Sequence, residues 1–184
     1  MNKETIMNFS AKLGAYVGGG FIVTYLLIHV LQGTLHTSND FSGNITLIIL
    51  IAGIIIAIRK YRGTKTHFPY ADAFKVGFFT SMFAAILGSF FLYIYYSFIS
   101  PEAIDQYLVL QQNVMLASGM QEGQVEQFTN LMQGMLSPGM MAIFGLVGNL
   151  FLGLIISLIA AAFLKRNGTN PNAFDQSMSE IKED

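Results

Sequence analysis

The stretch that decides the fold runs from residue 140 to residue 164 and reads MMAIFGLVGNLFLGLIISLIAAAFL. It contains no Asp, Glu, Lys or Arg. An α-helix rises ~1.5 Å per residue, so roughly 20 apolar residues cross the ~30 Å hydrocarbon core of a bilayer with every backbone amide bonded inside the helix. This stretch is long enough and therefore predicts a membrane-spanning helix.

Three further windows are equally free of charge, at residues 13–31, 41–58 and 76–99. We expect four spans in a single domain over residues 1–168, at about residues 9–31, 41–58, 73–99 and 138–164. A cleaved secretory signal is the alternative for the first window, but residues 32–36 (QGTLH) offer no A-x-A-like cleavage site, so we expect an uncleaved anchor. Composition agrees, because 53% hydrophobic and 11% charged residues, with a mean hydropathy of +0.51, leave too little polar surface for a soluble globule.

The distribution of positive charge predicts the orientation. All ten Lys and Arg lie before the first window, between or at the edges of the second and third, or after the fourth. Residues 32–40 and 100–139 have none. Short loops rich in Lys and Arg stay in the cytoplasm, so we expect both termini there, including a polar tail at residues 169–184. The basic loop 59–65 (RKYRGTK) either fixes this orientation alone or also rests on anionic headgroups.

The segment between the third and fourth spans, residues 101–137, is expected outside the membrane. Ser100-Pro101 and Ser137-Pro138 are helix-start signals at its two ends. Apolar residues recur at helical spacing and predict two amphipathic helices rich in Met. The candidate partner surface consists of Ile104, Leu108, Met115, Val125, Phe128, Leu131 and Met132. The alternative is that this face packs on the end of the bundle or lies in the headgroup layer.

Small residues spaced four apart allow membrane helices to approach closely. The candidate helix-packing residues are Gly14, Gly18, Gly88, Gly145, Asn149, Gly153 and Ser157. We favour packing inside one bundle over a homo-oligomer interface. Asn149 is the most polar residue deep in a span, and we expect it to bond to another span, at Thr24 or Tyr25; the alternative is contact with a substrate or ion.

The chain carries no constellation that predicts catalysis. His29, Gln32 and His36 share one helix face, but no acidic or histidine cluster completes a metal site around them. The chain has no Cys, which removes thiolate ligands and nucleophiles. We find no nucleophile beside a base and no paired carboxylates. We therefore expect no enzyme activity, no metal and no cofactor.

Several short stretches, taken in order, resemble one family. They are YADAFKVG at residues 70–77, YIYY at 93–96, ISPE at 99–102, SPG at 137–139, GLIISLIAA at 153–161 and LKR at 164–166. Together they are similar to the bacterial multi-pass membrane family named domain of unknown function 4199 (DUF4199), over about residues 5–166. The resemblance implies an inner-membrane protein without an assigned activity, so it adds no site residue.

These observations predict an all-α integral membrane four-helix bundle with a two-helix amphipathic external segment between its third and fourth helices. We expect a noncatalytic protein of the inner (plasma) membrane that binds a partner protein or lipid through the external Met-rich helices. The alternative is an oligomeric module that transports ions or small solutes. Expected partners are the lipid bilayer and, as a possibility, a second copy or another membrane protein, but no nucleic acid.

Overall fold

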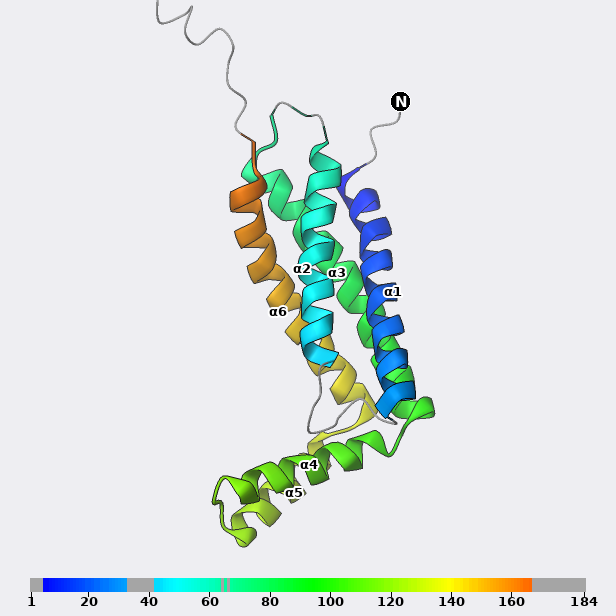
Figure 1. Cartoon of the computed structure of the whole chain (residues 1–184), viewed down its shortest axis with the longest axis vertical. Coiled ribbons are helices and arrows are strands. Elements are labelled where there is room, and N and C mark those ends of the chain that lie inside the picture. Colours follow the sequence, from blue (N-terminus) through cyan, green and yellow to red (C-terminus); the bar gives the residue numbers. More distant parts are fainter. Residues whose placement is uncertain (1–4, 33–41, 64, 66, 167–184) are drawn as a thin grey trace, which may run out of the picture.

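The computed structural model describes residues 5–32, 42–63, 65 and 67–166 of the chain. The described part contains six α-helices and one π-helical turn, and no β-strand (Figure 1). Their order is α1 (Ile6–Gln32), α2 (Ser42–Arg62), α3 (Tyr70–Ile94), η1 (Tyr95–Ile99), α4 (Ala103–Ala117), α5 (Glu122–Met135) and α6 (Pro138–Leu164). The predicted all-α class is confirmed.

Four of these helical segments are long and apolar enough to cross a bilayer. They cover Ile6–Leu31, Gly43–Arg62, Tyr70–Ile99 and Pro138–Leu164. The predicted two-helix segment between the third and fourth spans is also confirmed, as α4 and α5. The expected polar tail at residues 169–184 lies outside the described residues.

Helix α3 is the centre of the bundle, and its most extensive packing is against α6 and α1. It runs parallel to α1, and two side-chain contacts from α1, one to α3 and one to η1, join residues 66 positions apart. The Ser10 hydroxyl donates to the Val76 carbonyl oxygen at 3.2 Å, and His29 Nδ1 lies 3.0 Å from the Tyr95 hydroxyl. A Cβ on Gly14 would lie 2.7 Å from the Thr80 carbonyl oxygen. Only a residue without a side chain permits this approach.

The same α1–α3 seam continues through two further glycines. A Cβ on Gly18 would lie 3.0 Å from Leu87 Cβ, and one on Gly88 would lie 3.1 Å from the Phe21 ring. Phe21 is completely buried. Because lipid is as apolar as the side chains, close van der Waals contact must hold these helices together. Gly14, Gly18 and Gly88 therefore lie where α1 and α3 pack inside one bundle.

Helices α3 and α6 are antiparallel and meet through another set of small residues. A Cβ on Gly153 would collide with the Ser81 side chain, and one on Gly77 would lie 2.9 Å from the Ser157 hydroxyl. A Cβ on Gly145 would lie 2.8 Å from Leu92. The buried Ser157 hydroxyl has no hydrogen-bond partner among the described residues. Ser157 therefore contributes to the packing of α3 on α6 through its small volume and not through a hydrogen bond.

The end of the bundle that carries the start of α1, the α2–α3 connection and the end of α6 is rich in Lys and Arg, and we call it the basic end (Figure 1). Here Phe68 and Arg166 form a pair of backbone hydrogen bonds, both 2.9 Å long. Arg62 Nη1 donates to the Leu164 carbonyl oxygen at 3.3 Å, at the negative end of α6. These contacts join α2, α3 and α6.

At the opposite end, the α4–α5 pair lies across the bundle axis (Figure 1). The turn between the two helices contains Gly119 at a φ of 87°, a left-handed conformation that favours glycine. Ala103 and Ile104, at the start of α4, are buried in one apolar cluster with Tyr95 and Tyr96 of η1 and Ile28 of α1. This cluster attaches the pair to the bundle.

Candidate functional site

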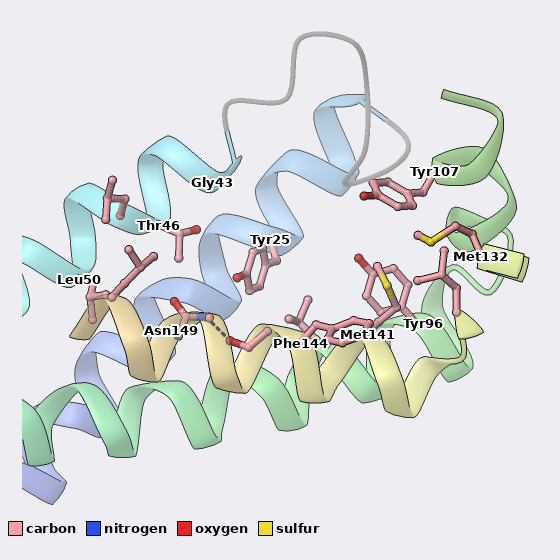
Figure 2. A pocket seen from close by; sticks show the side chains of 16 residues that line it. Tyr25, Gly43, Thr46, Leu50, Tyr96, Tyr107, Met132, Met141, Phe144 and Asn149 are labelled. Atoms are coloured by element: carbon pink, nitrogen blue, oxygen red, sulfur yellow. Dashed lines mark hydrogen bonds between the residues drawn. The ribbon is translucent and has the colours of Figure 1, made fainter. Parts of the chain in front are cut away.

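A cavity of about 490 Å³ lies where the bundle meets the α4–α5 pair (Figure 2). Most of its wall comes from α2 and α6. Tyr25 of α1, Leu92 of α3, Tyr96 of η1, Tyr107 of α4, Met132 of α5 and Leu136 complete it. We call it the interhelical cavity. It is formed by helices from both ends of the chain, so only the folded protein contains it.

Glycines leave room for this cavity. A Cβ on Gly43 of α2 or on Gly148 of α6 would meet no atom within 4 Å. Gly145, three residues before Gly148, also lines the cavity, but a Cβ there would lie 2.8 Å from Leu92 of α3. The small residues of α6 therefore serve two purposes: one face allows close packing on α3, and Gly148 leaves space beside α2.

The cavity wall is largely apolar but carries a few polar side chains. Tyr25, Thr46, Tyr96, Tyr107 and Asn149 are the polar members of the lining, and the others are Leu, Met, Phe or Gly. Figure 2 shows these polar side chains on several different helices around the same space. Apolar walls with a small number of placed polar groups are typical of sites for organic molecules. The arrangement suits a molecule that is mostly apolar and has a polar part.

Asn149 is half-buried in this wall. Its Nδ2 donates to the Gly145 carbonyl oxygen, one turn earlier in its own helix, at 2.9 Å (Figure 2). The predicted hydrogen bond to Thr24 or Tyr25 is therefore wrong, and Thr24 donates within α1 to the Gly20 carbonyl oxygen. The short amide side chain reaches its own backbone more easily than a neighbouring span. The described residues supply no donor to Asn149 Oδ1, which can accept a hydrogen bond from a molecule in the cavity.

The interhelical cavity opens on the side of the bundle. Phe144 and Leu152 line it on α6 and are 50% and 41% exposed. In a helix of this hydropathy, an exposed apolar face meets lipid. Phe144 and Leu152 therefore border both the cavity and the exposed apolar side of α6.

The junction between η1 and α4 contains a charge-assisted hydrogen bond. The buried Ser100 hydroxyl donates to Glu102 Oε1 at 2.7 Å. This bond is the main reason why the pKa of the Glu102 carboxyl is lowered from its ordinary value, and a backbone hydrogen bond and the nearby His29 lower it further. Ser100 also donates its backbone N–H to the Tyr95 carbonyl oxygen, closing the π turn. The junction that positions α4 is therefore specifically bonded.

The residues of the candidate partner surface differ in their exposure: three are buried, two are half-buried and two are exposed. Ile104, Leu108 and Val125 are buried, which fits the alternative of a packed face rather than an exposed partner surface. They belong to the packing of α4 and α5 with each other and with the bundle, because burial of these apolar side chains is what orders two short helices. Met115 is half-buried. Met132 lines the interhelical cavity instead of facing a partner.

Phe128 and Leu131 of the predicted surface are exposed, and Leu131 is 68% exposed. The candidate partner surface did not include the remaining exposed large apolar side chains of the pair. They are Val109, Val114, Leu116, Met120 and Met135. Both faces of α4 contain apolar residues, so periodicity alone could not distinguish the packed face from the exposed one.

His29 takes part in a polar contact within the bundle. Its Nδ1 lies 3.0 Å from the hydroxyl of Tyr95, which is completely buried, and the two rings meet edge to face. The other members of the face considered for a metal cannot be compared, because the Gln32 side chain and His36 lie outside the described residues. Within the described ranges, no three His, Cys, Asp or Glu side chains gather as metal ligands would.

One family model matches most of the chain. The model of a protein of unknown function (DUF4199) matches residues 12–166. The chain belongs to the DUF4199 family. The match covers every residue that lines the interhelical cavity, from Tyr25 to Leu152, so the cavity is built by the segment that defines this DUF4199 protein.

Searches of curated proteins and of solved structures found no significant match. Family membership therefore brings no ligand, reaction or partner to this chain.

Proposed function

We propose that this DUF4199 protein is a noncatalytic membrane protein that binds a lipid-like amphiphile in the interhelical cavity. The observation that carries the proposal is the cavity between α2, α6 and the α4–α5 pair, with apolar walls and a few polar side chains. Its volume of about 490 Å³ falls within the roughly 300–1,000 Å³ range of ligand sites. The α4–α5 pair would act as part of the binding site, through Tyr107 and Met132.

The polar side chains favour an amphiphile over a pure hydrocarbon. Asn149 lines the cavity and offers a carbonyl oxygen that can accept a hydrogen bond from a ligand. Buried polar groups reward a ligand that bonds to them and penalise one that does not. Entry from the side through Phe144 and Leu152 suits a molecule that dissolves in the bilayer.

We also propose that the protein lies in the plasma membrane with its basic end in the cytoplasm. The support is that the basic end carries Lys and Arg, whereas the α4–α5 end carries only acidic charges. Binding of a partner protein at the exposed apolar side chains of α4 and α5 stays a prediction, and so does transport by an oligomer.

The absence of Trp from the sequence allows a direct binding experiment. We would introduce Leu152→Trp at the cavity opening and measure energy transfer to a dansyl-labelled C11 fatty acid in nanodiscs. Transfer that unlabelled palmitate displaces reports on a saturable site, and transfer that it does not displace reports on probe dissolved in lipid. We expect displaceable transfer in the reporter protein.

Gly148→Phe, added to the reporter, should fill the cavity and weaken displaceable binding at least ten-fold. Gly19→Phe is the matched control, because a Cβ there also meets no atom within 4 Å and Gly19 does not line the cavity. Equal displaceable binding in the two variants would show that the probe does not occupy the interhelical cavity, and the proposal would fail.

A further inference from the structure

Helix α2 has a groove on each side near the basic end. One groove, of about 370 Å³, lies between α2 and α6 and is lined on α2 by Ile51, Ile55 and Arg59. The other, of about 510 Å³, lies between α1 and α2, and Lys60 lines it. Neither groove includes a residue of the interhelical cavity. They are separate from the site discussed above.

Each groove has the same design, an apolar wall that ends in one basic side chain. Residues four apart lie on one side of a helix, so Ile51, Ile55 and Arg59 form a row that faces α6. Gly53, Ile56 and Lys60 form a second row, which faces α1. The two rows lie on different sides of α2 because consecutive residues of a helix point about 100° apart. The two adjacent basic residues therefore end two different grooves.

Arg62 and Lys65, the next basic residues along the chain, are engaged within the protein. Arg62 donates to the Leu164 carbonyl oxygen, and Lys65 Nζ lies 3.8 Å from the centre of the Tyr61 ring. Arg59 and Lys60 are exposed, and neither side chain has a hydrogen-bond or ionic partner within the described ranges of the chain. A positive charge beside a lipid-facing groove is complementary to an anionic headgroup.

The depth of the grooves fits one leaflet. From Ile49 to Lys60, at ~1.5 Å per residue, the wall extends roughly 16 Å, close to half of the ~30 Å hydrocarbon thickness. The row from Ile51 to Arg59 extends roughly 12 Å. An acyl chain lying along either wall would therefore place its phosphate beside Arg59 or Lys60. Arginine bonds phosphate oxygens in a bidentate manner.

We propose that the two grooves beside α2 bind anionic phospholipids, with an acyl chain against the apolar wall and the phosphate on Arg59 or Lys60. This role is independent of the interhelical cavity. It assigns to two residues of the basic loop a specific contact in addition to their contribution to orientation.

Native mass spectrometry of the full chain, released from nanodiscs of equal phosphatidylglycerol and phosphatidylcholine, tests the proposal. We expect retained phosphatidylglycerol in preference to phosphatidylcholine, and no competition by inorganic phosphate. Arg59→Gln and Lys60→Gln should each weaken binding in its own groove about five-fold, which corresponds to ~1 kcal/mol for one basic side chain near the membrane surface. The double variant should retain little phosphatidylglycerol above the phosphatidylcholine level.

Lys75→Gln is the matched control, since it removes one exposed positive charge near the basic end outside both grooves. Retention should be unchanged in this variant. Equal retention of the two lipids, or an equal loss in Lys75→Gln and Arg59→Gln, would show that only diffuse surface charge acts and would overturn the proposal. Displacement by inorganic phosphate would also overturn it, because an anion site without the acyl groove would then suffice.

Discussion

The two sides of the bundle differ in how closely their helices approach. On one side, α3 meets α1 and α6 through residues so small that a single added Cβ at Gly14 or Gly153 would collide with the neighbouring helix. On the other side, a Cβ at Gly43 or Gly148 would meet nothing, and α2, α6 and the α4–α5 pair enclose the interhelical cavity. The same residue type therefore serves close packing in one place and open volume in the other.

Because of this difference, we expect the two sides of the bundle to contribute differently to stability and to ligand binding. In lipid, helices gain association energy mainly where their surfaces fit closely, so the α3 seams hold the bundle together. A region with open volume contributes less packing energy and is free to receive another molecule. Substitutions on the α3 seams should therefore change stability, and substitutions beside the cavity should change binding.

The largest expected effect comes from Gly153→Leu. The added side chain must displace Ser81 of α3, and such overpacking costs about 3 kcal/mol. The free energy of unfolding, measured by denaturant titration in detergent micelles, should fall by about this amount. Gly148→Leu, five residues earlier in the same helix, is the control and should change it by less than about 0.5 kcal/mol, because open space receives the new side chain. Equal losses in both variants would remove the distinction between the two sides.

A smaller effect is expected where α1 meets η1, beside the α4–α5 end. Tyr95→Phe removes the hydroxyl that His29 Nδ1 contacts at 3.0 Å, in a completely buried position. Side-chain hydrogen bonds between membrane helices contribute about 0.6–1 kcal/mol, so the free energy of unfolding should fall by that amount. Tyr93→Phe removes a hydroxyl from a residue that is 45% exposed and should have almost no effect. If Tyr95→Phe and Tyr93→Phe have the same free energy of unfolding, the His29–Tyr95 contact does not stabilise the bundle.

The smallest effect concerns the junction that connects the bundle to α4. Because the Ser100 hydroxyl bonds the Glu102 carboxylate, the pKa of Glu102 is lower in the folded protein than in the unfolded chain. The stabilisation is therefore present above the unfolded-state pKa and is lost as the pH falls through the folded-state pKa. Ser100→Ala should raise the pKa of Glu102 toward its ordinary value in an NMR titration in micelles.

Ser118→Ala is the control for this titration, since its hydroxyl donates to the Met115 carbonyl oxygen, far from the junction in the sequence. The pKa of Glu102 should be the same as in the unmodified chain. An unchanged pKa in Ser100→Ala would show that another group, such as the backbone donor or His29, lowers it.

Much of the fold was predictable because a bilayer imposes strict requirements on the chain. Charge-free windows of about 20 residues predicted the four spans, and the Ser137-Pro138 signal predicted the start of α6, where the Ser137 hydroxyl accepts from the Met140 N–H. The site was less predictable. The sequence identified Asn149 as the most polar residue deep in a span, but the predicted hydrogen bond to another span was wrong. Its side chain bonds to the Gly145 carbonyl oxygen, because hydrogen bonds to residue i−4 of the same helix compete with contacts between helices.

Sequence by itself determined the helices, their order, the two-helix segment between the third and fourth spans, and the basic and acidic ends, since these depend on local hydropathy and charge. Only the tertiary structure decided at which glycines an added Cβ would collide with α3 and at which it would meet open space, because the sequence shows the same residue type in both cases. It also decided that Ile104, Leu108 and Val125 are buried while Leu131 is exposed. Burial depends on which surfaces meet, and that is a property of the packed helices together rather than of any one of them.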